Sequence, residues 1–207
     1  MRSYRGVVEA WEQLDAESVV RHSRPDLVSL AQTLLIQRTP PDHFHPCARM
    51  KRCVVTSVEE IVNVDRWAQY KLKREQISKA LQKRQGYPDV RQLAPGVLDV
   101  RKHIPHAVLQ QGANEVLLYH GTKNHNVEFI AQQGFDDRMN HRGLFGSGLY
   151  FTCDSCKAAD YCDFGQTGCL ILARVLLGHP GLARVRLGFG SVLALGARWG
   201  FRGEAGG

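Results

Sequence analysis

Two short apolar segments, each with polar or small residues at one end, constrain this chain more than any other feature. Residues 117–122 read Leu-Leu-Tyr-His-Gly-Thr, and residues 146–151 read Gly-Ser-Gly-Leu-Tyr-Phe. A short apolar run bounded by turn residues is typical of a buried strand. The two segments therefore predict a sheet whose strands carry functional groups at their ends.

Helical periodicity marks the beginning of the chain, and residues 1–41 are predicted to be helical. Within residues 26–37 the apolar residues recur at i, i+3, i+4 and i+7, with Ser23 and Pro25 as the expected N-cap and first-turn proline. A second helix is predicted after a strand at residues 53–58. One side of that helix carries Trp67, Tyr70, Ile77 and Leu81. Both apolar faces are expected to pack against a core rather than to bind a ligand.

Three further elements are predicted before the amino-acid composition changes at residue 178. Residues 126–133 form a short helix ended by Gly134, Asp154 or Ser155 caps a helix running to about Cys162, and residues 169–177 form a buried strand. Residues 178–207 then hold nine glycines, four arginines and no aspartate. This composition predicts a Gly/Arg-rich tail that is poorly ordered.

Composition excludes several classes of protein. The chain has 207 residues and 43% hydrophobic residues, which is enough for one domain with a core, and no apolar stretch reaches the length of a membrane span. The N-terminus does not lead into a signal-peptide core, so we expect an intracellular protein, nuclear or cytoplasmic. The net charge of +7 is too small and scattered to indicate a nucleic-acid binder, although a basic nucleic-acid binder remains an alternative.

The cysteines and histidines do not match a metal site. Cys153-x-x-Cys156 with Cys162 and Cys169 would need four converging thiolates, and the cluster of His43, His45, Cys47 and Cys53 lacks paired ligand spacing. We expect no metal and no disulfide scaffold.

The glycines at 143, 146 and 148 do not form a nucleotide loop of the common kinds. A dinucleotide fingerprint opens a helix after a strand, whereas these glycines precede the apolar residues 149–151. A Walker lysine is also missing. Rossmann and P-loop folds are therefore excluded by context.

A combination of motifs identifies a family instead. His120-Gly121-Thr122, Gly134-Phe135-Asp136, residues 146–151 and Lys157-Ala158-Ala159-Asp160-Tyr161 follow one another in this order. In order and spacing they resemble the catalytic domain of the poly(ADP-ribose) polymerase family, the diphtheria-toxin-like ADP-ribosyltransferases. Within that family, the sequence most resembles the mono-ADP-ribosylating members and the tankyrases.

The resemblance implies an α+β fold with a mixed, mainly antiparallel split sheet of the ADP-ribosyltransferase type and an N-terminal helical extension. Residues 1–52 would be the helical extension and linker, and residues 53–177 the catalytic domain. Residues 178–207 would be the tail, so that the C-terminal part of the domain is truncated or divergent.

The resemblance also implies an activity: cleavage of the nicotinamide–ribose bond of NAD, the co-substrate, and transfer of ADP-ribose to a protein acceptor. His120 and Tyr150 would be catalytic. The His120 side chain would bond an adenosine ribose hydroxyl, the Gly121 backbone would bind the nicotinamide amide, and Tyr150 and Tyr161 would sandwich its ring. The implied NAD-binding set is His120, Gly121, Thr122, Arg138, Tyr150, Phe151, Ala158 and Tyr161.

Two departures from the family pattern leave a second function open. Ala158 stands where many members carry a serine that helps to bind the amide, a loss of about 1 kcal/mol. The triad glutamate, which stabilises the cationic sugar from a late strand, is not found, and Glu204 is not assigned its role. The alternative is a catalytically impaired variant that binds NAD weakly or acts as a protein-interaction module.

Overall fold

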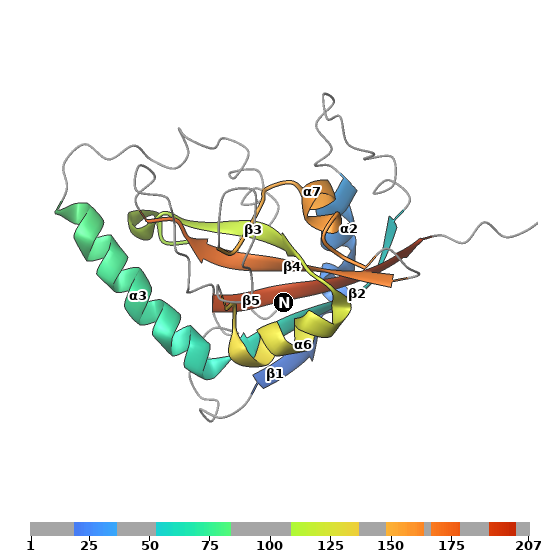
Figure 1. Cartoon of the computed structure of the whole chain (residues 1–207), viewed down its shortest axis with the longest axis horizontal. Helices are drawn as coiled ribbons and strands as arrows, with labels where there is room; N and C mark the ends of the chain where they lie inside the picture. Colours follow the sequence, from blue (N-terminus) through green and yellow to red (C-terminus); the bar gives the residue numbers. More distant parts are fainter. Residues whose placement is uncertain are drawn as a thin grey trace, which may run out of the picture.

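The strands that the structure describes form one antiparallel sheet. The structure is a computed structural model that describes residues 19–36, 53–83, 109–136, 148–163, 167–178 and 191–201. Its five strands lie in the order β1-β2-β5-β4-β3, as Figure 1 shows. They are β1 (Val19–Ser23), β2 (Cys53–Asn63), β3 (Glu115–Gly121), β4 (Thr167–Leu176) and β5 (Ser191–Phe201). The predicted α+β class and its antiparallel pairing are confirmed.

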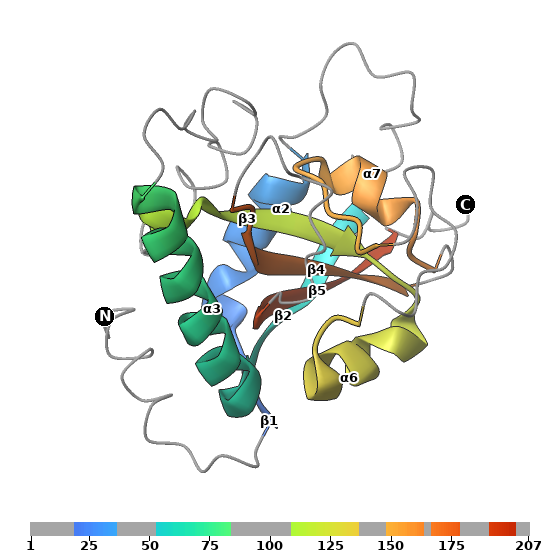
Figure 2. The same ribbon diagram turned by 60° about the vertical axis from the view of Figure 1, so that its left-hand side comes forward.

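Helices cover both faces of this sheet. α2 (Val28–Ile36) and α7 (Ser155–Ala159) lie on one face, and α6 (Asn124–Gln133) lies on the other (Figures 1 and 2). α3 (Val64–Gln82) contacts β5 and the short 3-10 helix η4 (Gln111–Ala113), which leads into β3. Another 3-10 helix, η1 (Pro25–Leu27), precedes α2.

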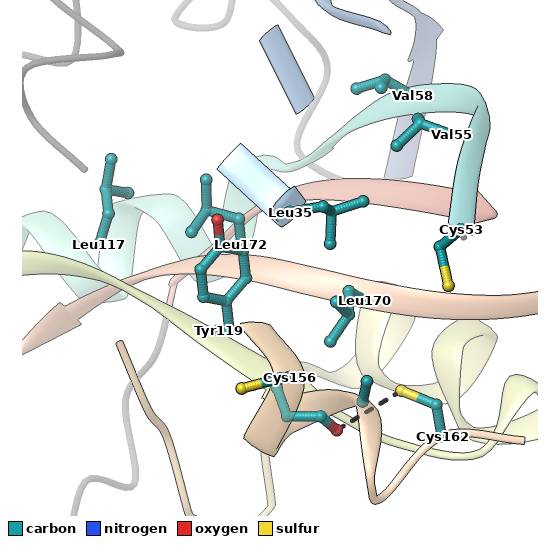
Figure 3. Close-up of a cluster of buried hydrophobic side chains, with 12 residues drawn as sticks. Leu35, Cys53, Val55, Val58, Leu117, Tyr119, Cys156, Cys162, Leu170 and Leu172 are labelled. Atoms are coloured by element: carbon teal, nitrogen blue, oxygen red, sulfur yellow. Dashed lines mark hydrogen bonds between the residues drawn. The ribbon is translucent and has the colours of Figure 1, made fainter. Parts of the chain in front are cut away.

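The side chains of the strands alternate between the two faces of the sheet, and this divides the core into two clusters. On the α2/α7 face, Leu117 and Tyr119 of β3 pack with Leu35 of α2 and with Leu170 and Leu172 of β4 (Figure 3). On the α6 face, the intervening residues of β3 and β4 pack with Ile130, Ala131 and Phe135. Because successive side chains of a strand point to opposite faces, the one strand β3 supplies both clusters.

The expected poorly ordered tail is wrong for residues 191–201. These residues form β5, which lies between β2 and β4 in the middle of the sheet. The physical reason is the pairing: β5 supplies hydrogen-bond partners to two strands that would otherwise each expose an edge. The glycine content of the tail concealed this strand.

The expectation of helix throughout residues 1–41 is also wrong for residues 19–23. They form β1, which pairs with β2 from Val19 opposite Asn63 to Ser23 opposite Glu59. Ser23 therefore ends a strand and is not an N-cap, while Pro25 opens η1 as a first-turn proline. Pairing with the long strand β2 outweighs the weak helical preference of these five residues.

The predicted helices that correspond to α2, α3 and α6 are confirmed. α7 ends at Ala159, before the expected Cys162, and its N-cap residue Asp154 makes no side-chain capping bond. α3 buries Trp67 and Tyr70, and α6 ends at Gly134, whose φ of 74° suits glycine. Asn63 joins the two helices, because its side chain accepts from the Arg66 backbone N–H at the start of α3 and donates to the Gln132 carbonyl oxygen at 2.8 Å. Among the described residues, none of the helices has the length and apolar character needed to cross a membrane.

Candidate active site

The side chain of His120 is fixed near the end of β3 by one hydrogen bond. Its Nδ1 lies 3.0 Å from the backbone carbonyl oxygen of Tyr150. A carbonyl oxygen only accepts, so Nδ1 must carry the hydrogen. In the neutral ring the other nitrogen, Nε2, is then an acceptor. The structure thus selects one tautomer of His120, which the sequence alone left open.

Aromatic rings surround this imidazole. The ring of Phe135 meets it edge-on with centroids 5.0 Å apart, the ring of Phe151 lies at 5.4 Å, and the two phenyl rings contact each other at 5.1 Å. Burial lowers the pKa of His120 below its ordinary value, and the contact with the Tyr150 carbonyl only partly offsets that effect. His120 is therefore neutral at pH 7.

Residues 150–152 lie along the outer edge of β3. The backbone N–H of Tyr119 donates to the Thr152 carbonyl oxygen at 2.7 Å, and the Thr152 N–H donates back to Tyr119 at 3.0 Å. This two-bond bridge fixes the register of residues 150–152 against β3. Tyr150 and His120 are therefore brought together although 30 residues separate them.

Gly121 lies against the backbone of α7. A Cβ added to Gly121 would lie 1.6 Å from the carbonyl oxygen of Ala158 and 2.6 Å from its carbon. Only glycine fits at this close approach. Ala158 itself is 2% exposed, and its methyl group carries no polar atom that could replace a serine hydroxyl. Gly121 and Ala158 are thus neighbours in the site, as the resemblance implies for an NAD pocket.

The remaining predicted residues lie around these. Tyr150 is half-buried, whereas Tyr161 is one of the exposed aromatic residues, with 56% of its surface accessible. Thr122 is buried, and its hydroxyl oxygen accepts from the Asn126 side chain at 3.1 Å. Arg138 lies outside the described residues. The side chains of Tyr150 and Tyr161 both keep exposed surface. That they stack on the two faces of the nicotinamide ring stays a prediction.

The cysteines are placed in the core or at its border. Cys53, Cys156, Cys162 and Cys169 are buried, and Cys153 is half-buried. Within the described ranges no three histidine, cysteine or acidic residues come together to hold a metal ion. His43, His45 and Cys47 lie outside those ranges.

Sequence reasoning missed the part played by Phe135. It recorded Gly134-Phe135-Asp136 as one of the recurring motifs but gave the phenyl ring no function. The ring is 7% exposed and lies against both His120 and Phe151. An apolar residue directly after a helix-ending glycine is the signal that could have indicated a packed position.

Most of the chain matches a known protein family. Residues 42–185, well over half of the chain, match the family described as "Poly(ADP-ribose) polymerase catalytic domain", and the protein belongs to that family. Membership implies NAD as the co-substrate.

Two curated relatives share sequence with the chain. Both are named "Protein mono-ADP-ribosyltransferase PARP11", one from Mus musculus and one from Homo sapiens. Each is 29% identical over 115 residues, which is 55% of this chain and 27% or 26% of the relative. The chain thus spans about a quarter of the length of these relatives.

Proposed function

We propose that this protein is an NAD-dependent protein ADP-ribosyltransferase that transfers one or more ADP-ribose units to a protein acceptor. The observation that carries the proposal is the neutral, single-tautomer imidazole of His120 directly beside Gly121. A partly buried hydrogen-bond acceptor next to a backbone without a side chain suits a ligand that offers a hydroxyl and a flat amide-bearing ring. NAD offers both.

Each side chain has a distinct task in this reaction. Nε2 of His120 accepts a hydrogen bond from a ribose hydroxyl, and the phenyl rings of Phe135 and Phe151 hold the imidazole in that orientation. The backbone of Gly121 bonds the nicotinamide amide. Tyr150 and Tyr161 offer ring faces for stacking, which contributes about 0.5–1.5 kcal/mol per aromatic pair beyond burial. These contacts position the nicotinamide–ribose bond for cleavage.

The bond changes follow from this arrangement. The C1′–nitrogen bond between ribose and nicotinamide breaks, and nicotinamide leaves with the bonding electrons. A nucleophilic acceptor atom then bonds to C1′ and loses its proton to solvent. Positive charge develops on the sugar in the transition state, so a nearby carboxylate would stabilise it.

A second function is favoured by the composition of β5. By resemblance the stabilising glutamate comes from a late strand, and β5, the last strand described, contains no acidic residue. In the sheet register His120 lies opposite Ile171, and Ile171 opposite Gly196 of β5. A chain that binds NAD but turns it over slowly, as an impaired variant or interaction module, is the alternative.

One experiment separates these functions. The unmodified protein, His120→Ala and His22→Ala are compared for incorporation of labelled ADP-ribose from NAD and for binding of nicotinamide. His22 is an exposed histidine of β1 and serves as the matched control. We expect incorporation by the unmodified protein and by the His22 variant, and its loss in the His120 variant.

Two other outcomes decide against the transferase. Nicotinamide binding without incorporation favours the impaired variant, and the absence of both rejects an NAD site altogether.

A further inference from the structure

Two segments of the proposed NAD pocket run side by side and touch at successive residues. We call this contact, between residues 121–124 and residues 158–163, the seam. It begins where the Cα of Gly121 meets the carbonyl oxygen of Ala158. The sulfur of Cys162 comes next: it lies 3.6 Å from that same Ala158 oxygen (the dashed line in Figure 3) and 3.1 Å from the Cys169 carbonyl oxygen, either of which can accept its one hydrogen. The sulfur also accepts from the Thr122 backbone N–H.

Charged and polar groups complete the seam at its outer end. The ammonium of Lys123 donates to the Cys162 carbonyl oxygen at 3.3 Å and lies 3.4 Å from Oδ1 of Asp163. The other oxygen, Oδ2 of Asp163, accepts from the Asn124 backbone N–H at 2.7 Å. One carboxylate therefore holds two consecutive residues of the opposite segment.

This carboxylate takes the place of a local helix cap. α6 begins at Asn124, and its N-cap residue Lys123 makes no side-chain capping bond. A first-turn N–H needs an acceptor, and a negative charge at a helix N-terminus is favourable. Asp163, which is 39 residues away in sequence, supplies both. The start of α6 is thus attached to the segment that carries Tyr161.

Tyr161 depends on its backbone for its position. Its side chain is exposed, so little packing holds the ring. The backbone is held on one side by the bond from the Tyr161 N–H to the Ala158 oxygen at 3.1 Å, and on the other by Asp163 two residues later. The distance between the Tyr161 backbone and Gly121 is therefore set by the seam.

From this geometry we infer that Asp163 is a positioning residue for the nicotinamide half of NAD. It fixes the backbone that carries Tyr161 relative to Gly121 and so sets the affinity for the nicotinamide ring without touching the ligand. The inference rests on the proposed function, because it assigns to Asp163 the shape of that same pocket.

The ionic character of the contact adds a property that can be measured. The bond from the Asn124 N–H and the neighbouring Lys123 ammonium hold the pKa of Asp163 below its ordinary value, so the carboxylate is charged at neutral pH. Both partners of the Lys123–Asp163 pair are partly exposed, at 51% and 39%. Salt screens such exposed pairs. Nicotinamide affinity should therefore fall as salt is raised.

The test compares the whole chain with three variants: Asp163→Ala, Asp163→Asn and Asp65→Ala. Asp65 is an exposed aspartate in the first turn of α3 and is the matched control. Nicotinamide binding is measured by calorimetry at about 50 mM and about 500 mM salt, which spans weak to strong screening. The KM for NAD, kcat and amide exchange at Asn124 are measured alongside.

We expect Asp163→Ala to weaken nicotinamide binding and raise the KM for NAD by about five- to tenfold while kcat changes by less than about twofold. Asn124 exchange should accelerate. Asp163→Asn, which keeps an oxygen acceptor, should lose less affinity and lose the salt dependence. Asp65→Ala should bind as the unmodified chain does.

Other outcomes overturn the inference in different ways. If both Asp163 variants bind nicotinamide as tightly as the unmodified protein, the positioning role is wrong and the proposed function stands. A fall in kcat with unchanged KM shows a general loss of folded protein instead. If Asp163→Ala does not fold, the affinity and salt dependence of Asp163→Asn decide alone. If the unmodified chain binds no nicotinamide, the proposed function fails, and this inference with it.

Discussion

The carbonyl oxygen of Ala158 occupies the place that a side chain on Gly121 would need, 1.6 Å from the expected Cβ position. Backbone atoms cannot move aside as the end of a flexible side chain can. The two segments of the seam therefore approach each other as closely as glycine alone permits.

We expect Gly121→Ala to lower the free energy of unfolding by about 3 kcal/mol, because the added methyl group forces the seam apart. Nicotinamide binding should be lost together with stability. Urea denaturation and calorimetry measure the two effects. Gly148→Ala is the control, since a Cβ there meets nothing within 4 Å, and its unfolding free energy should stay within about 0.5 kcal/mol of the unmodified value. An equally stable Gly121→Ala protein would contradict the contact.

The lowered pKa of His120 predicts how stability depends on pH. Burial depresses the pKa in the folded state below 6.5, so the unfolded chain takes up a proton first as the pH falls. The contribution of the neutral imidazole to stability is complete above about pH 6.5 and is lost progressively below it. Unfolding free energies of the unmodified protein and of His120→Gln are measured from pH 8 to pH 5. The unmodified protein should be the more stable of the two at pH 8, and the difference in unfolding free energy should shrink as the pH falls to 5.

The matched control for this experiment is the exposed histidine of β1. His22→Gln should follow the curve of the unmodified protein over the whole range. A His120→Gln curve that runs parallel to the unmodified one would show that His120 does not titrate with folding. NAD binding by the unmodified protein should weaken over the same acid range, because a protonated Nε2 no longer accepts a hydrogen bond.

A buried ionic cluster lies at the opposite end of β3 from the site. The carboxylate of Glu115 is not exposed, and it accepts from the Tyr70 hydroxyl at 2.8 Å and from the Gln110 N–H at 2.7 Å. The Arg174 guanidinium lies 3.2 Å from it. Glu115→Gln should cost about 3 kcal/mol in unfolding free energy, because it leaves a buried guanidinium without its counter-charge. Glu75→Gln on the exposed face of α3 is the control, and equal effects of the two changes would contradict this account.

The thiol of Cys162 should resist alkylation. Burial raises its pKa to about 12, so at pH 8 only about one molecule in ten thousand carries the reactive thiolate. Cys153, which is half-buried, should react first. Peptide mapping after iodoacetamide treatment of the folded protein resolves the two, because Lys157 separates them in a tryptic digest. Rapid modification of Cys162 under native conditions would show that the seam opens.

Much of the sheet was predictable because three of its strands are apolar runs. The strands predicted near residues 53–58, 116–119 and 169–177 correspond to β2, β3 and β4. The strand expected at residues 146–151 is wrong for the described residues 148–151, and next to them only Thr152 makes an isolated bridge, to Tyr119. β2 extends further, to Asn63, through two glutamates that do not suggest a buried strand. Glu60 is buried because the Arg24 guanidinium lies 2.8 Å from its carboxylate, and that pairing spans 36 residues.

The fifth strand escaped prediction for a different reason. Its sequence alternates Leu193, Leu195, Ala197 and Trp199 with smaller or polar residues, which is a strand pattern. Two glycines interrupt the alternation and reduce the local preference for a strand. Pairing with β2 and β4 provides the stabilisation that the local sequence lacks.

In the candidate site, the motifs identified the residues but not how they are held. His120, Gly121 and Tyr150 could be named because their spacing matches a family. The tautomer of His120, the edge-on contact with Phe135 and the cap supplied by Asp163 depend on segments 15 to 39 residues apart. Such contacts have no local signature in a single sequence.

The central place of β5 has a consequence for how the protein is made. β1 pairs with β2, and β3 pairs with β4, whereas the backbone hydrogen bonds of the described sheet join these two pairs through β5. During synthesis both pairs must wait, each with an open edge, until residue 201 has emerged. Non-local closure of this kind is slow, and open edges invite pairing with other chains. We therefore expect the nascent protein to need protection from aggregation until β5 is in place.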